Sequence, residues 1–237
     1  MQYSELAEVY DSLIYDMPYE KWADFIEKNS SGDVLELACG TGNLTKLLAK
    51  RRIVTALDIS PEMLRIADGK LRTLGRRVRF VQGDMRTFAL NKPVNTVVCA
   101  CDGINYLTDD DSVKRTFINV HKSLNSGGTF IFDISSYYKL SKMNNELYSE
   151  DTDDVTYIWR NSFENDILNM DIAFFVTDDG ENYTRFDETH VQRAHRTDEL
   201  ARLLRECGFE EIKITDDYSE TEVKNDSLRI TFCAKTR

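Results

Sequence analysis

Short apolar runs alternate with segments of helical spacing over the first 134 residues. Five runs, at residues 34–37, 53–57, 78–81, 94–100 and 129–134, have the length and composition of buried strands. Between them, apolar residues recur every three or four positions, as on the buried side of an amphipathic helix. Five strand–helix alternations predict an α/β fold whose core is a doubly wound, mostly parallel sheet.

Beyond residue 135 the pattern changes from helical spacing to a period of two. After a polar link at residues 135–154, the runs 155–163, 168–176 and 183–193 alternate apolar and polar side chains. They predict an antiparallel β-meander inserted after the fifth strand. Two more strands, near residues 211–215 and 227–234, would complete a seven-stranded sheet.

Several helix boundaries can be predicted from capping residues. The segment before the first strand has helical spacing that is interrupted at Met17-Pro18, so we expect two short helices with the proline at the hinge. A helix at residues 113–124 is expected to end at Gly127-Gly128, and Thr197 is the expected N-cap of the last helix.

Composition and charge limit the classes of partner. The chain has 237 residues, 41% of them hydrophobic, which suffices for one α/β domain with a substantial core. Its formal net charge of −11 argues against a broad nucleic-acid surface, which needs clustered Lys and Arg. The five cysteines lack metal-ligand spacing, so no metal site is predicted, and they are typical of reduced thiols. With neither a signal peptide nor a membrane span expected, we predict a soluble, cytoplasmic protein.

The first apolar run leads directly into two glycines, Gly40 and Gly42, and then into a helical pattern. Glycines suit a sharp strand-to-helix turn where a ligand approaches main-chain N–H groups, as in nucleotide sites. A dinucleotide fingerprint would need a third glycine where Thr45 stands, and the Gly-Lys-Ser/Thr ending of a phosphate loop is absent. Instead Glu36 lies within the strand, where a carboxylate would repel a pyrophosphate but could accept hydrogen bonds from an ammonium group.

The sequence Glu-Leu-Ala-Cys-Gly-Thr-Gly at residues 36–42 resembles motif I of the class I S-adenosylmethionine-dependent methyltransferases. The resemblance implies a ligand that carries a sulfonium and an amino acid instead of phosphates. From end to end the chain is similar to small bacterial members of this family, in the group that includes sugar-amine N-methyltransferases. This similarity implies S-adenosylmethionine as cofactor and a Rossmann-like core at 31–134 and 195–237. It also implies a helical lid at 1–30 and a meander at 135–194 over the acceptor.

Acidic residues at the ends of the second and third runs extend the expected cofactor site. Asp58 could accept hydrogen bonds from both hydroxyls of a ribose, since Ser60 already occupies the cap of the next helix. Gly83-Asp84-Met85 resembles the family's adenine site, although a plain Gly-Asp turn is the alternative. The cofactor-binding candidates are Tyr10, Tyr19, Glu36, Ala38, Gly40, Gly42, Asp58, Ile59, Met63, Asp84, Met85 and Cys101.

The fourth run ends at Cys101-Asp102, the strand tip where acceptor and methyl group meet in the family. Asp102, Asn105 and Tyr106 are therefore candidates for orienting the nucleophile, although a turn aspartate and a packing tyrosine fit these positions equally well. His190, in the third run of the meander, is a candidate general base, although a lone histidine in a strand is more often a structural residue.

We interpret the chain as a methyltransferase that transfers a methyl group in line to a nitrogen or oxygen atom of a small molecule, as a monomer or homodimer. The strand tip lacks the Asn/Asp-Pro-Pro-Tyr/Phe and Pro-Cys patterns of base and glutamine methylation, which disfavours a nucleic-acid acceptor. Alternatives are an RNA or protein methyltransferase of the same fold, or a module that binds the cofactor without turnover. An NAD-linked oxidoreductase is disfavoured by Thr45 and Glu36.

Overall fold

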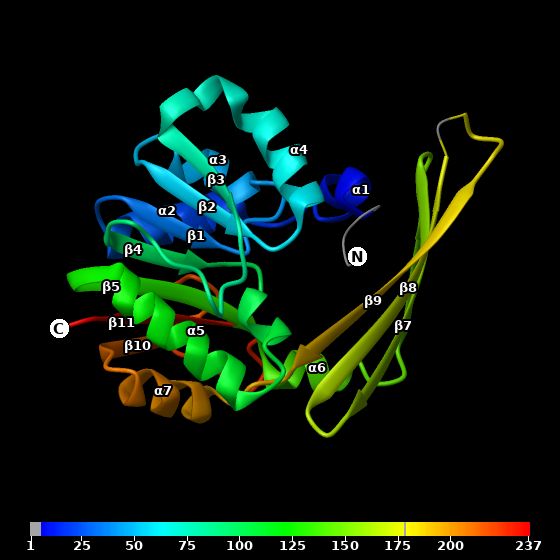
Figure 1. The fold of residues 1–237 in the computed structure, drawn as a ribbon. Helices are drawn as coiled ribbons and strands as arrows, with labels where there is room; N and C mark the ends of the chain where they lie inside the picture. Colours follow the sequence, from blue (N-terminus) through cyan, green and yellow to red (C-terminus); the bar gives the residue numbers. More distant parts are fainter. Residues whose placement is uncertain (1–5, 178) are drawn as a thin grey trace.

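Seven strands form one sheet at the centre of the protein, in the order β10-β11-β5-β4-β1-β2-β3 (Figure 1). The computed structural model describes residues 6–177 and 179–237, so the part of the expected lid at residues 1–5 lies outside it. The strands are β1 (Val34–Leu37), β2 (Val54–Asp58), β3 (Val78–Gln82), β4 (Val94–Cys99), β5 (Leu124–Ser135), β10 (Glu210–Asp216) and β11 (Arg229–Lys235). From β5 to β3 neighbouring strands are parallel, whereas β11 is antiparallel to both its neighbours. The doubly wound, mostly parallel seven-stranded sheet predicted from the sequence is confirmed.

Helices cover both faces of this sheet. The helices on these faces are α2 (Tyr19–Asn29), α3 (Asn43–Leu48), α4 (Pro61–Leu71), α5 (Asp110–Ser123) and α7 (Thr197–Glu206). Two others, α1 (Leu6–Leu13) and α6 (Tyr137–Lys142), pack on a second sheet. Because successive residues of a strand point to opposite faces, Val98 packs in one apolar cluster with α2, α3 and α4, while Val97 packs in the other with α5 and α7. Burial of both strand faces explains why the strands appear as continuous apolar runs in the sequence.

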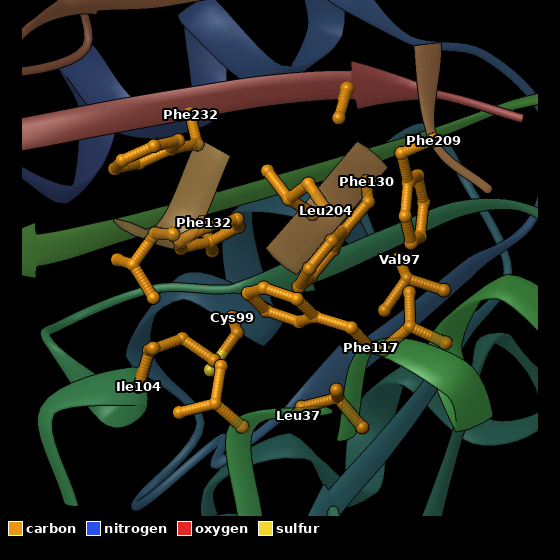
Figure 2. Close-up of a cluster of buried hydrophobic side chains, with 14 of the residues drawn as sticks. Leu37, Val97, Cys99, Ile104, Phe117, Phe130, Phe132, Leu204, Phe209 and Phe232 are labelled. Carbon is orange, nitrogen blue, oxygen red and sulfur yellow. The ribbon is translucent and has the colours of Figure 1, made fainter. Parts of the chain in front are cut away.

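Five buried phenylalanines, labelled in Figure 2, lie in the cluster beneath α5 and α7. Phe132 of β5 stacks on Phe232 of β11 with the ring centroids 4.6 Å apart, and Phe117 of α5 lies 5.5 Å from Phe132. Truncating a buried phenylalanine of this kind typically costs about 3–5 kcal/mol. This packing fixes β4 and β5 relative to β11, so the strand ends that carry polar side chains are held on a rigid base.

A second sheet, of order β6-β7-β8-β9, follows β5 and α6 in the chain (Figure 1). Its strands are β6 (Leu147–Asp151), β7 (Val155–Glu164), β8 (Ile167–Val176) and β9 (Thr184–Arg193), all antiparallel to their neighbours. The predicted meander is therefore present, but the prediction of a polar link at 135–154 is wrong. That segment forms α6 and β6 because Ser136 caps the helix and Leu140 and Met143 pack on Leu168.

Three local predictions are also wrong. No helix connects β3 to β4, so the strand–helix alternation is interrupted at residues 83–93, where Asp84 forms a turn instead. The helix before β5 ends at Ser123, and Gly127-Gly128 lie within β5, where the Gly128 carbonyl accepts a hydrogen bond from the Thr236 N–H. Thr197 is the first residue of α7, not its cap; Arg196 precedes the helix and lies over the Tyr137 ring.

The two leading helices have different neighbours. As predicted, they are separated at Met17-Pro18, with Pro18 directly before α2. Trp22 of α2 packs into the core cluster, whereas Leu6 of α1 packs with Val155 and Phe174 of the second sheet. Helix α1 therefore links the main sheet to the inserted one. Within the described residues, no helix is long and apolar enough to cross a membrane.

Candidate active site

A cavity of about 860 Å³ lies at the carboxyl ends of the parallel strands. Its lining comes from the ends of β1, β2 and β4, from α1, and from strands β7, β8 and β9 of the inserted sheet. In open α/β sheets this edge is the usual position of a ligand site. The volume falls at the upper end of the range for small-molecule pockets.

The glycine-rich loop between β1 and α3 forms one side of this cavity. The backbone is left-handed at Ala38, Gly40 and Gly42, with φ of 52°, 54° and 81°. Gly40 lines the cavity, and the nearest atom to a Cβ placed there would be Tyr10 Cε1 at 3.9 Å, so this backbone is open to a ligand. Gly42 does not line the cavity. A Cβ there would approach Ala67 Cβ to 3.2 Å, so Gly42 permits α4 to pack against the loop.

Asp58 connects the second strand to this loop. Its Oδ2 accepts a hydrogen bond from the Gly40 N–H at 2.8 Å, and its Oδ1 accepts one from the Ser60 N–H at 2.9 Å. The residue is 7% exposed, and this burial raises the pKa of its carboxyl while the backbone hydrogen bonds oppose the shift. Ser60 caps α4 by accepting from the Met63 N–H, as predicted. A carboxylate has about four lone-pair positions, so Asp58 retains acceptor capacity toward the cavity.

A smaller cavity of about 30 Å³ adjoins the loop and is lined by Glu36 and Tyr19. Glu36 Oε2 accepts a hydrogen bond from Thr45 Oγ1 at 2.6 Å, which explains why threonine stands where a dinucleotide site would have glycine. Burial raises the pKa of Glu36 to about 8, and the hydrogen bond from Thr45 partly opposes this. A nearby cation would restore the charged form of this carboxyl.

Asp84 occupies a turn at the end of β3. Its Oδ1 accepts hydrogen bonds from the Arg86 N–H at 2.8 Å and from Arg86 Nε at 3.0 Å. These bonds lower the pKa of Asp84 and keep the carboxylate charged. Asp84 thus forms the plain turn that the sequence analysis gave as the alternative to an adenine site. It also lines the cavity beside Met85.

Beyond β4, two consecutive non-glycine residues have left-handed backbone: Cys101 with φ of 59° and Asp102 with φ of 51°. Such conformations persist only where the surroundings hold them, and they concentrate at functional sites. Here Asp133 Oδ2 accepts a hydrogen bond from the Asp102 N–H at 3.0 Å. The Asp102 side chain accepts from Gln192 Nε2 at 2.8 Å and from Arg229 Nη1 at 3.3 Å.

Arg229 joins these carboxylates into one buried network. Its guanidinium pairs with both Asp133 and Asp102 and lies 4.9 Å from the centre of the Trp22 ring. Tyr218 donates a hydrogen bond to Asp133 Oδ1 at 2.7 Å and stacks on Trp22. Burial alone would raise the pKa of Asp102, but Arg229, Lys139 and the hydrogen bond from Gln192 together outweigh that effect and hold the pKa below its ordinary value.

Tyr106 and His190 meet across the cavity wall between the short 3₁₀ helix Gly103–Tyr106 and β9. The Tyr106 hydroxyl lies 3.4 Å from His190 Nδ1. Burial lowers the pKa of His190 to about 4, so the imidazole is neutral near pH 7. Asn105, also predicted to orient the nucleophile, is buried and does not line the cavity. It fixes the two elements to each other, because its Nδ2 donates to the Arg193 carbonyl at 2.9 Å.

Comparison with known proteins shows which family has this fold and sequence. A family model described as a methyltransferase domain matches residues 34–128. YqeM of Bacillus subtilis (strain 168), a provisionally named methyltransferase, is 36% identical over 99% of this chain and 97% of its own length. The structure of an S-adenosylmethionine-dependent methyltransferase from Clostridium acetobutylicum is 40% identical, covers 99% of this chain and 98% of its own, and superposes with a TM-score of 0.90.

The chain belongs to the class I S-adenosylmethionine-dependent methyltransferases. S-adenosylmethionine is accordingly its cofactor, as the sequence predicted. CalS10, an amino pentose methyltransferase from Micromonospora echinaspora solved with bound S-adenosylmethionine, has a TM-score of 0.78 at 19% identity and covers 97% of each chain. At this identity the likeness extends to the fold alone.

Most of the residues predicted for the methyltransferase site lie around the two cavities. The main cavity is lined by Tyr10, Ala38, Gly40, Asp58, Ile59, Met63, Asp84, Met85, Cys101, Asp102, Tyr106 and His190. Tyr19 and Glu36 line the smaller one, and Gly42 lines neither. Their individual roles remain predictions.

Sequence reasoning missed several residues that hold the lining of this methyltransferase site in place. Asp133 could have been noticed, because a charged residue inside an apolar strand is rarely buried without a partner. Arg229 and Tyr218 gave no local signal, since their partners are about a hundred residues away in the chain. Asp11 of α1 was also missed, although it accepts hydrogen bonds from Thr41 Oγ1 at 2.5 Å and Asn43 Nδ2 at 3.0 Å.

Proposed function

We propose that this methyltransferase transfers the methyl group of S-adenosylmethionine directly to a nitrogen or oxygen atom of a small molecule. The observation that carries the proposal is the continuity of the main cavity. One space runs from Gly40 and Asp58 at the glycine-rich loop to Tyr106 and His190 under the inserted sheet. A donor bound at the first end and an acceptor bound at the second would therefore share one enclosure.

The residues at the first end fit the cofactor. Asp58 keeps acceptor capacity for a ribose diol, and Ile59, which is 57% exposed at the cavity, offers an apolar surface suited to a flat ring. Met63 and Met85 line the same region. Buried Glu36 would become charged beside an ammonium group. When bound, S-adenosylmethionine supplies an electrophilic methyl group on a sulfonium whose departure leaves a neutral thioether.

The residues at the second end suit the handling of an acceptor. We assign His190 as the general base, oriented by Tyr106. Its lowered pKa keeps the imidazole neutral but makes it a weak base, so it would take the proton only as methyl transfer makes that proton of the acceptor acidic. Asp102 is held in the charged form by Arg229, so we assign it an orienting and electrostatic role in place of a proton-accepting one. Alignment of the two reactants can contribute about 7–11 kcal/mol to lowering the barrier.

The net charge of −11 supports a free small molecule over RNA as acceptor, and we propose that the enzyme works in the cytoplasm as a monomer or homodimer. Screening a metabolite library for release of S-adenosylhomocysteine tests the function. We expect turnover with at least one small amine or hydroxyl compound and loss of that turnover in Asp58→Ala. Tight binding of S-adenosylmethionine without turnover of any compound would favour a module that only binds the cofactor, and turnover of RNA or protein alone would favour a macromolecular acceptor.

A further inference from the structure

The part of the main cavity formed by β7, β8 and α1 is an apolar wall. Its side chains are Leu6, Leu13, Tyr157, Trp159, Met170, Ile172 and Phe174. Within the described part of the chain, no Asp, Glu, Lys or Arg of strands β6 to β9 lines the cavity. This wall is the only contribution of β7 and β8 to the lining among those residues, so whatever binds there meets hydrocarbon.

The two amphipathic rings of this wall have their polar atoms directed elsewhere. The Tyr157 hydroxyl donates a hydrogen bond to Glu150 Oε2 of β6 at 3.1 Å. Trp159 Nε1 is shut off from solvent and has no hydrogen-bond partner among the described residues, so a ligand in the cavity cannot reach it. Both residues therefore contribute ring carbon to the wall and offer no free donor, since the Tyr157 proton is already bonded to Glu150.

Polar groups gather instead where β9 meets the end of β4. Gln192 donates to Asp102 at 2.8 Å, and the Tyr106 hydroxyl lies 3.4 Å from His190 Nδ1. Lys139 of α6 lines the same region and donates to Ser135 Oγ at 3.2 Å. The acceptor half of the cavity is thus divided into one polar corner and one apolar wall.

We propose, resting on the methyltransferase function above, that the acceptor is an amphiphilic small molecule with one amine or hydroxyl head and an aromatic or alkyl body. The head lies at the polar corner and the body packs on the apolar wall, where burial of its surface is favourable. A sugar would press several hydroxyls against that wall, and each would lose its hydrogen bonds to water without replacement. The amino pentose enzyme CalS10 shares only the fold at 19% identity, so its acceptor does not decide the question.

Pairs of probes that differ only in the body test this inference. Tryptamine against glucosamine, and 2-naphthol against glucose, are titrated calorimetrically into the full chain saturated with S-adenosylhomocysteine, so that no turnover is needed. We expect each apolar-bodied probe to bind at least tenfold more tightly than its sugar partner, a difference of about 1.4 kcal/mol. Equal or tighter binding of the sugars, or no detectable binding of either apolar probe up to its solubility limit, would overturn the proposal.

Variants of one wall residue separate wall chemistry from folding. Met170 is 5% exposed, and Met170→Gln keeps its volume but adds a polar amide, whereas Met170→Leu keeps it apolar. We expect at least tenfold weaker tryptamine binding with glutamine and little change with leucine, while S-adenosylhomocysteine affinity stays constant in both. Ile172→Thr makes the same test at a half-buried position should Met170→Gln not fold. Failure of S-adenosylhomocysteine to bind the wild-type chain would refute the proposed function itself, whereas normal binding with no preference between probes would refute only this inference.

Discussion

Replacing Arg229 with methionine should lower the free energy of unfolding by about 3–5 kcal/mol, the usual effect of removing one partner from a buried ion pair. The Arg229 side chain is only 12% exposed, and it pairs with Asp133, whose side chain is fully buried, and with Asp102 at 3.3 Å. Methionine would fill similar space but leave buried Asp133 and largely buried Asp102 without the cation that pairs with both. For a domain of this size the melting temperature should then fall by about 6–20 °C. A pair on the surface would contribute at most about 1 kcal/mol.

Urea unfolding followed by circular dichroism measures this difference, and its pH dependence tests the cause. In Arg229→Met the unpaired carboxylates have a raised pKa, so protonation of one of them stabilises the folded variant as the pH falls. The deficit relative to wild type should therefore shrink between neutral pH and about pH 5. Arg229→Lys, which keeps the charge, is the matched control and should lose less. A loss below about 1 kcal/mol, or a deficit that does not change with pH, would refute the reasoning.

Three further predictions concern the site. Asp58→Ala should weaken S-adenosylmethionine binding at least about tenfold, because a hydrogen bond to a charged group contributes about 1.5–3 kcal/mol; unchanged affinity in calorimetric titration would rule out the ribose assignment. Asp11→Asn removes the charge that Lys70 Nζ contacts at 2.5 Å and weakens the bond from Thr41, so limited proteolysis should cut the leading helix faster; a wild-type rate would show that α1 docks without this carboxylate. Burial lowers the pKa of His190 from 6.5 to about 4, so titration of His190 should produce no inflection near pH 6.5 in the pH profile of kcat/KM. An inflection there that is present in wild type and absent in His190→Gln would contradict this. The unfolded chain binds more protons between these two pH values, so stability should fall there as the pH drops, and less so in His190→Gln; an equal fall in both would contradict the pKa shift.

The main sheet was predictable because both of its faces are buried, so its strands appear in the sequence as continuous apolar runs with recognisable ends. The errors lie where local sequence is ambiguous. The segment 135–154 is polar overall, yet it folds as α6 and β6 because Leu140 and Met143 find partners in the inserted sheet. Gly127-Gly128 could end a helix or lie in a strand, and only the pairing of β5 with β11 decides between these.

The cofactor side of the site was more predictable than the acceptor side for a physical reason. Gly40 and Asp58 follow strands directly, so their positions at the sheet edge follow from the strand order. Arg229, Asp133 and Tyr218 come together only through the antiparallel pairing of β11 with β5 and through the loop before β11. No spacing in the sequence encodes such a contact, whereas a charged residue inside an apolar strand at least indicates that a partner exists.

Helix α1 is attached at both of its sides. Asp11 is bonded to the glycine-rich loop, while Leu6 and Leu13 pack on the inserted sheet. A displacement of this helix that opened the donor end of the enclosure would also loosen the acceptor end. We therefore expect S-adenosylhomocysteine and the methylated product to be released by the same displacement of α1, so that their release rates are coupled.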